Sequence, residues 1–389
     1  MKKRYLFILT FIIIISIVLV NKLQIRNAHI VNEEIFEHIE RDLKEENIKN
    51  IDLLAVGDIM FHIPQIKSAK IKDGSYDFVP VFKHVREYIE GADIAIANFE
   101  TVTVDERRYS GFPRFNSPGA SILALKEIGF DILSTANNHS LDQGKQGVIS
   151  TLKNIEDVGL KSIGTYNEPQ TELFVEEVQG INIGFLSYTY GVNGLEATLS
   201  KEELSYMINL IDEDKIEKDI SDLREREVDI IVVFIHWGYE YHREPSKYQI
   251  ELGNKMIGWG ANIVLGSHPH VIQRAETIDY NGKNNFVIYS MGNFISNQSE
   301  ITTGNPYTED GVMVKINIEK NLESGETSIK DIDYIPTWVH KFKEEGKLKY
   351  EILPVPYILS EDLNLDLNEK TMLKIKRSYV DTMKVLENQ

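Results

Sequence analysis

The chain of 389 residues contains no cysteine. This absence excludes disulfide bonds, thiolate catalysis, zinc sites with cysteine ligands and a lipid anchor attached through a thioether. It fits an exported protein that does without disulfides as well as a protein of a reducing compartment. Any metal site in this chain must therefore use oxygen and imidazole ligands.

Basic residues are scarce relative to acidic ones, with 42 Lys and Arg against 60 Asp and Glu, a formal charge of −18. Such a balance opposes nonspecific binding to nucleic acid or to an anionic membrane surface. A polyanionic substrate would need a local cation, and a bound metal ion could supply it. We expect no nucleic-acid partner.

Histidine is also rare, yet two of the ten histidines lie in VLGSHPHVIQ, residues 264–273. His268 and His270 stand there at the end of an apolar run, on either side of Pro269. One interpretation is a turn that happens to contain imidazoles. The other is a metal site.

The N-terminus has Lys2, Lys3 and Arg4 ahead of an apolar run from Tyr5 to Val20. This pattern predicts membrane targeting. We expect an uncleaved signal anchor at 1–21, a polar stalk at 22–50 and a single-pass protein of the cell membrane whose main domain is extracytoplasmic. The alternative is a cleaved signal peptide.

After residue 50, apolar strands alternate with amphipathic helices, which predicts an α/β domain over 51–340. A C-terminal extension, 341–389, includes a charged helix. The expected strands are near 51–57, 93–98, 131–136, 181–187, 229–235, 261–265, 285–291, 311–318 and 328–335. The expected helices are near 78–90, 119–129, 144–158, 213–226, 246–258 and 366–387.

Polar residues repeatedly follow these strands, and in open α/β sheets ligands gather beyond the carboxyl ends of strands. Each residue alone is typical of a turn or cap. Together they favour a metal centre, because four of the ten histidines stand beside acids and amides at strand ends. The residues are Asp58, Glu100, Asn137, Asn138, His139, Asp142, His236, His268 and His270.

Neutral imidazole and carboxylate suit Mn²⁺, Zn²⁺ or Fe²⁺. A carboxylate can bridge two ions about 3.5–4 Å apart, and such a pair can hold a hydroxide and stabilise both sides of an in-line displacement. The residue types therefore predict a divalent-metal site of a catalytic kind, and we expect two ions in it.

The ordered motifs GDIM, NFET, FPRFNSP, NNHSLDQG, HWGYEY, GSHPHVIQ and YSMGNFISNQ resemble the CapA-type family associated with poly-γ-glutamate capsule synthesis. The resemblance covers about residues 51–318. That family resembles the calcineurin-like metallophosphoesterases. The resemblance implies a four-layer α-β-β-α sandwich, an anionic polymer or phosphoester substrate, and membrane subunits of a poly-γ-glutamate synthase as partners.

The resemblance also implies roles for individual residues. Glu100 takes the place of the bridging carboxylate, and His139 faces the substrate as a catalytic residue. Where the phosphoesterases have a histidine, this chain has Met60, and His62 is the candidate replacement. The implied metal ligands are Asp58, His62, Glu100, Asn138, His236, His268 and His270.

Further residues complete the predicted site. Asp142 is expected to orient the ring of His139, although a helix N-cap is an equal alternative for it. The candidates for substrate binding are Asn137, Arg114, Trp237 and Glu240. Arg114 is the only cation inside the motifs.

Two functions remain open from the sequence. The first is an extracytoplasmic, metal-dependent hydrolase or transferase that attacks a phosphate ester or an amide of a polymer. The second is a non-catalytic subunit of a membrane complex for capsule synthesis, which uses the site to bind the carboxylates of the polymer.

Overall fold

The computed structural model describes residues 15–16, 19–23, 47–360 and 365–387. The chain divides into two units, Met1–Lys49 with Asn321–Gly325 and Asn50–Lys320 with Glu326–Gln389. Most of the predicted signal anchor and of the polar stalk lies outside the described residues. Within the described ranges, no helix has the length and hydrophobicity needed to cross a membrane.

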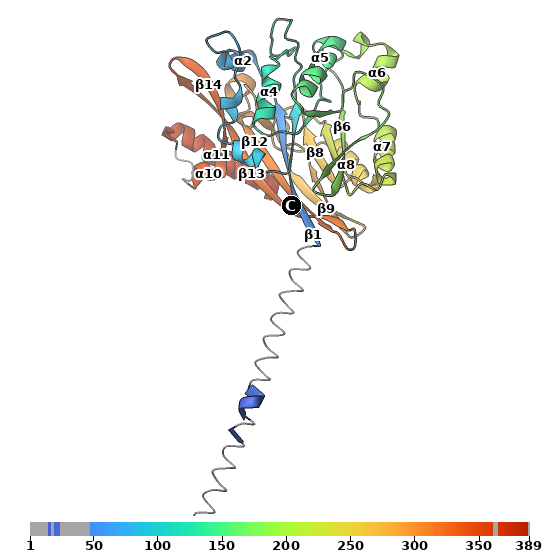
Figure 1. Cartoon of the computed structure of the whole chain (residues 1–389). Coiled ribbons are helices and arrows are strands. Elements are labelled where there is room, and N and C mark those ends of the chain that lie inside the picture. The colour runs from blue at the N-terminus through green and yellow to red at the C-terminus, as the bar shows by residue number, and fades with distance from the viewer. Residues whose placement is uncertain (1–14, 17–18, 24–46, 361–364, 388–389) are drawn as a thin grey trace, which may run out of the picture. The chain divides into compact units, whose positions relative to one another are not determined.

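Within the described part of the chain, two sheets form the core of the fold (Figure 1). The strand order of the first sheet is β14-β13-β12-β1-β2-β3-β4, and β11 pairs with β1. Its strands are β1 (Ile48–Ile59), β2 (Ile94–Phe99), β3 (Ile132–Ser134), β4 (Lys161–Ile163), β11 (Asn293–Ile295), β12 (Asp310–Asn321), β13 (Thr327–Glu344) and β14 (Lys347–Pro354).

The strand order of the second sheet is β5-β6-β7-β8-β10-β9. Its strands are β5 (Phe174–Val178), β6 (Ile181–Thr189), β7 (Ile230–His236), β8 (Ile263–Ser267), β9 (Ala275–Tyr280) and β10 (Lys283–Ile288). In each sheet the central strands are parallel, β1 through β4 in the first and β6, β7, β8 and β10 in the second. Parallel strands direct their carboxyl ends to one edge, where ligands gather in such sheets.

The alternation of side chains along the strands defines the layers. Leu53 of β1 and Val232 and Phe234 of β7 belong to one apolar cluster, so these faces of the two sheets pack against each other. Leu54 of β1 points the other way and packs with helical residues, and Val233 of β7 does the same on the second sheet. Because consecutive side chains of a strand point to opposite faces, both sheets are buried on both sides.

Helices cover the two outer faces. On the first sheet the apolar cluster includes residues of α2, η1, α3, α4 and α5. On the second sheet it includes residues of α7 and α8. The bounds are α2 (Ile63–Ala69), η1 (Val79–Phe82), α3 (Arg86–Glu90), α4 (Ala120–Glu127), α5 (Gly144–Asp157), η2 (Glu196–Thr198), α6 (Lys201–Met207), α7 (Glu213–Glu225), α8 (Lys247–Trp259), α9 (Glu300–Thr303), η3 (Pro306–Glu309), α10 (Val355–Leu359) and α11 (Glu369–Glu387).

These layers agree with the predicted α/β class and with helices on both sides of two packed sheets. The expected helix at 78–90 is instead η1 followed by α3. The expected boundary at residue 340 falls inside β13, which pairs with β14 from Thr337 to Glu344. The hairpin therefore belongs to the first sheet.

Two glycines at the carboxyl ends of strands allow close approach of neighbouring backbones. A Cβ atom on Gly57 would lie 2.0 Å from the Gly292 carbonyl oxygen, and one on Gly266 would lie 2.1 Å from that of Tyr289. Any side chain at these positions would push β1 and β8 away from their neighbours. The glycines thus bring the strand ends close to the loops that follow β10.

Candidate metal centre

The ends of four strands bring five of the predicted ligands to one place. Asp58 is near the end of β1, Glu100 follows β2, His236 ends β7, and His268 and His270 follow β8. All five side chains are buried, with at most 4% of each residue exposed. A further residue, Asn138, comes from the loop after β3. We call these residues the metal cluster: Asp58, Glu100, Asn138, His236, His268 and His270.

One group of potential ligands consists of Asp58, Glu100 and His270, whose donor atoms all lie within 4.8 Å of one another. His270 Nδ1 donates to Asp58 Oδ2 over 2.9 Å. Its other ring nitrogen, Nε2, lies 3.7 Å from Glu100 Oε1. One carboxylate oxygen and one imidazole nitrogen therefore face each other without a hydrogen bond between them.

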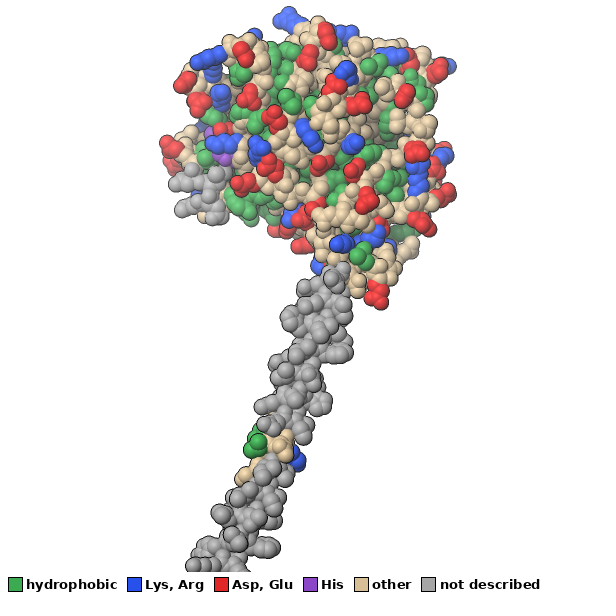
Figure 2. Space-filling view, in the orientation of Figure 1, with side chains coloured by type: hydrophobic (Ala, Val, Ile, Leu, Met, Phe, Trp, Pro, Cys, Tyr) green, Lys and Arg blue, Asp and Glu red, His purple; other side chains and the backbone are tan. Residues whose placement is uncertain are grey.

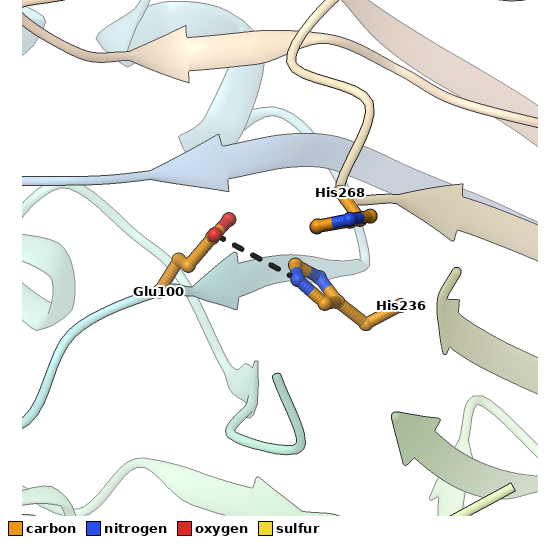
Figure 3. Close-up of side chains that lie close together, drawn as sticks. All are labelled: Glu100, His236 and His268. Atoms are coloured by element: carbon orange, nitrogen blue, oxygen red, sulfur yellow. Dashed lines mark ion pairs between the residues drawn. The ribbon is translucent and has the colours of Figure 1, made fainter. Parts of the chain in front are cut away.

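A second group consists of Glu100, His236 and His268 (Figure 3). His236 Nε2 lies 3.7 Å from Glu100 Oε1 and 3.2 Å from Asn138 Oδ1. His236 Nδ1 lies 2.9 Å from Ser267 Oγ, which fixes the ring orientation. Glu100 belongs to both groups, as expected of a bridging carboxylate.

Two buried atoms of the metal cluster have no hydrogen-bond partner among the described residues, Glu100 Oε1 and His268 Nδ1. A buried carboxylate oxygen without a partner costs several kcal/mol, unless a cation compensates for its charge. A divalent cation next to both ligand groups would accept these lone pairs. The residues present therefore fit a metal ion, with oxygen and imidazole donors of the kind that Mn²⁺, Zn²⁺ and Fe²⁺ prefer.

The electrostatics of the metal cluster point the same way. Burial, together with the nearby Asp58 carboxylate, raises the pKa of Glu100 well above its usual value. Burial and the neighbouring imidazole of His268 lower the pKa of His236 well below its usual value. Burial lowers the pKa of His268 to about 3. Neutral imidazoles at neutral pH are ready to bind metal without first losing a proton.

The backbone on either side of Pro269 has an unusual conformation. His268 has a φ of 97° and His270 a φ of 56°, a region that side chains with a Cβ rarely occupy. The carbonyl oxygen of Pro269 accepts a hydrogen bond from Tyr241 N over 2.7 Å. Such backbone strain persists where the surroundings hold it, typically at functional sites. Here both imidazoles lie at the metal cluster, and a further group of potential ligands joins the two of them with Glu240.

His139 lies beside the metal cluster but belongs to none of its ligand groups. Its Nδ1 donates to Asp142 Oδ2 over 2.7 Å. The same oxygen accepts a hydrogen bond of 2.6 Å from Phe115 N. With Nδ1 held by Asp142, the Nε2 atom of His139 remains for contact with a substrate.

Asn137 lies deeper than a substrate contact would require. Its side chain is fully buried and donates to the Phe99 carbonyl oxygen over 2.9 Å. Its Oδ1 accepts from His139 N over 3.1 Å. These contacts connect the loop of His139 to the end of β2, so Asn137 positions the site from behind.

Two cavities open onto the metal cluster. One, of about 280 Å³, is lined by residues that include Met60, His62 and His270. The other, of about 290 Å³, is lined by residues that include Arg114 and Asn138. His139 and the exposed Glu240 line both. Arg114 and Glu240, predicted to bind substrate, thus lie where a substrate could reach them.

His62 and Trp237 do not join the ligand groups. His62 lines the first cavity, where burial lowers its pKa to about 4, but it belongs to none of the metal-competent groups found in the described residues. Trp237 is fully buried in the core beneath α8, and its Nε1 donates to the Tyr289 carbonyl oxygen. Its ring is part of that core and lines neither cavity.

Sequence reasoning missed Asn98 and Tyr190. Asn98 Nδ2 donates to Asp58 Oδ1 over 2.8 Å and to Glu100 Oε2 over 3.2 Å, so it holds both acids in place. Tyr190 packs its ring against His268 at 4.6 Å between centroids. Asn98 lies two residues before Glu100, on the same strand face, and that spacing was the available signal.

Comparison with known sequences shows which family this chain resembles. The family model described as "Bacterial capsule synthesis protein PGA_cap" matches residues 52–298. The capsule biosynthesis protein CapA of Bacillus anthracis is 30% identical over 292 residues, which cover 72% of this chain and 66% of that protein. The PGA biosynthesis protein CapA of Bacillus subtilis (strain 168) is 29% identical over 293 residues, which cover 72% and 70%. The chain thus matches slightly less than two thirds of the length of the first relative.

Similar solved structures include a calcineurin-like phosphoesterase, YfkN from Bacillus subtilis, with a TM-score of 0.44 and 13% identity over 87% of this chain and 98% of that one. A phosphatase from Mycoplasma pneumoniae has the same TM-score and identity, over 74% of this chain and 94% of that one.

Proposed function

Because the chain belongs to the family of bacterial capsule synthesis proteins, we propose that it is a metal-dependent hydrolase acting on an anionic capsule polymer or on a phosphoester related to it. The observation that supports this most directly is Glu100. It is shared by two ligand groups and has a buried oxygen without a partner among the described residues. Part of the proposal is that the two-sheet fold is of the metallophosphoesterase type and that two ions bind.

The proposed metal site consists of the chain's own donors. Asp58, Glu100 and His270 would hold one ion, and Glu100, His236 and His268 the other, with Asn138 beside the second. Bound divalent ions would polarise a substrate oxygen and lower the pKa of water at the site. Asn98 fixes Asp58 and Glu100 before any ion binds.

His139 is the proposed proton donor to the leaving group. Asp142 holds the Nδ1 proton, and the ring lines both cavities. The carboxylate orients the ring and stabilises the imidazolium, which carries a second proton on Nε2 and gives that proton to the leaving group. Burial of both side chains excludes water from the hydrogen bond between them.

The cellular setting is also a proposal. The basic and apolar N-terminus supports attachment to the cell membrane, with the domain outside the cell and next to membrane subunits of a poly-γ-glutamate synthase. The name of the Bacillus subtilis relative, a PGA biosynthesis protein, supports the polymer as substrate.

A second candidate function is a subunit that binds the polymer without cleaving it. Met60 stands where the phosphoesterases have a histidine, and His62 does not replace that ligand in the described groups. A metal cluster that retains only part of its catalytic ligands could still bind the carboxylates of a polymer.

The test uses the full chain and has two readouts. Elemental analysis should find bound Mn, Zn or Fe, and a screen over poly-γ-glutamate and phosphodiesters should find hydrolysis. Glu100→Gln should lose both, while Glu351→Gln, which changes a glutamate paired with His84 outside the metal cluster, should keep both. Metal without hydrolysis across the screen would favour the binding subunit. Absence of bound metal would refute the proposed site.

A further inference from the structure

The two cavities at the metal cluster share part of their lining. Three residues line both of them: Phe112, His139 and Glu240. The remaining residues of the two cavities come from different segments of the chain, so the cavities extend from His139 in two directions. Phe112 is 73% exposed and forms part of the rim where they join.

The chemistry of the two cavities differs. Beyond the shared residues and the ligands, the first is lined by neutral hydrogen-bonding groups such as Tyr241, Gln298 and Thr302. The second contains Arg114, the one Lys or Arg among the residues that line either cavity, together with the carboxylates of Glu240 and of Asp142, which is engaged by His139 and Phe115 N. No ion pair involves Arg114 within the part of the chain that the structure describes. Its guanidinium is available to an acidic group of a ligand.

The loop that presents Arg114 is held firmly next to His139. Ser110 Oγ donates to the Arg114 carbonyl oxygen over 2.6 Å, and Ser110 and Asn116 pair through both backbone hydrogen bonds. Phe115, the next residue, is fully buried with its ring 4.7 Å from that of His139. Its N–H donates to the same Asp142 oxygen that holds His139. One carboxylate therefore sets the positions of both the proton donor and the Arg114 loop.

Resting on the proposed function, we propose that the two cavities are subsites on either side of the bond to be cleaved. Arg114 binds an acidic group of the unit next to that bond, and the substrate is an anionic chain cleaved at an internal linkage. Hydrolysis adds the OH of water to the acyl or phosphoryl side and a proton to the leaving nitrogen or oxygen. Each half of the chain then leaves from its own cavity.

The decisive experiment measures binding of γ-linked glutamate oligomers of increasing length to the metal-loaded full chain. A neutral series of γ-linked isoglutamine oligomers, in which each free α-carboxylate is replaced by a carboxamide, is the comparison. Affinity for the glutamate series should increase with length until both cavities are filled, and should exceed that for the isoglutamine series. Arg114→Ala should weaken glutamate binding by about 10- to 100-fold, the loss expected for a charge-assisted hydrogen bond. Arg114→Lys should recover part of it, because it keeps the charge but not the planar fork.

Arg108→Ala is the matched control, since Arg108 is exposed in the preceding segment and lines neither cavity. It should bind as wild type does. Equal losses in the two variants would reduce the effect to net charge and overturn the inference. Equal binding of the glutamate and isoglutamine series would overturn it as well.

Turnover separates this inference from the proposed function. If wild type cleaves the glutamate oligomers and Arg114→Ala binds and cleaves them equally well, the inference fails and the hydrolase remains. If Arg114→Ala loses binding but wild type cleaves nothing, the subsite assignment holds and the hydrolase fails. Release of single terminal units alone, without products of intermediate length, would overturn internal cleavage.

Discussion

Two pairs of buried acidic residues in the same compact unit have opposite surroundings. In the metal cluster, Asp58 and Glu100 are fully buried, and no Lys or Arg of the described residues forms an ion pair with either. At the start of β12, Glu309 and Asp310 are almost as deeply buried, but both are paired with cations of α11. We call Glu309, Asp310, Lys374 and Arg377 the α11 clamp.

In the α11 clamp each buried acid has a basic partner. Arg377 donates to both oxygens of Asp310, over 2.8 and 3.2 Å, and Lys374 Nζ lies 2.9 Å from Glu309 Oε2. Burial still raises the pKa of Asp310 to about 7, although Arg377 opposes this shift. The acids of the clamp connect a helix to the sheet. Among the described residues, the acids of the metal cluster have no such Lys or Arg partner, and the proposed metal ions would compensate for their charge.

The largest expected effect is a loss of catalytic rate, and it should be confined to the metal cluster. His139→Ala should reduce kcat by about 10²- to 10⁴-fold, the contribution typical of positioned proton transfer, while metal content stays at the wild-type level. His84→Ala, which changes a buried histidine paired with Glu351, should leave kcat unchanged. If His139→Ala loses its metal, His139 is a ligand and the division of roles in the site is wrong.

The next effect concerns metal and stability. Adding Mn²⁺ or Zn²⁺ to metal-free protein at about 100 times the dissociation constant should raise the free energy of unfolding by about 2.7 kcal/mol. Denaturant unfolding with and without the ion measures this gain. His270→Ala should reduce it, because one of the two ligand groups loses its imidazole. Arg377→Met should retain it, and a loss there as well would mean that the two regions are coupled.

The contribution of the α11 clamp to stability should not depend on metal. Arg377→Met leaves Asp310 buried without its bidentate partner and should lower the free energy of unfolding by roughly 2–3 kcal/mol, with or without metal. Chemical denaturation of metal-free protein is the measurement. A change below the scatter of such measurements would show that the clamp contributes no more than an exposed ion pair.

The smallest effect is a gain in stability. Glu100→Gln in metal-free protein removes a buried acid that lacks a cation and should raise the free energy of unfolding by roughly 1 kcal/mol. The pKa of Glu100 is raised in the folded state, so its ionisation destabilises the fold as pH rises above the usual value of a glutamate. The advantage of Glu100→Gln should therefore be larger at pH 8 than at pH 5. An advantage that grows toward low pH would contradict the raised pKa.

The central strands could be predicted from the sequence because both faces of each are buried. β7, for example, is an unbroken apolar run from Ile230 to Ile235. Short edge strands gave no such signal, as in β5 with the sequence FVEEV. β14 was missed because its partner β13 continues four residues beyond the expected boundary. The length of β13 depends on its pairing with β14, which the local composition does not indicate.

The metal cluster was predictable from the residues at the strand ends. Which of those side chains face the cluster depends on the alternation of side chains along a strand. His236 faces the cluster, so Trp237, the next residue, has to face the opposite side of the sheet. The same rule places Asn98 with Glu100. The position of His62 depended on the cap of α2, where Gln65 Oε1 accepts from His62 N, and no sequence period describes that contact.

The long separation of the ligands along the chain has a kinetic consequence. Asp58 and His270 are 212 residues apart, and their contact requires β1 and β8, which belong to different sheets, to be in place. Closing so long a segment is entropically costly, so this pair should form after the folding transition state. Interactions that form late slow unfolding and leave the folding rate nearly unchanged. We therefore expect bound metal to prolong the lifetime of the folded chain without helping it to fold.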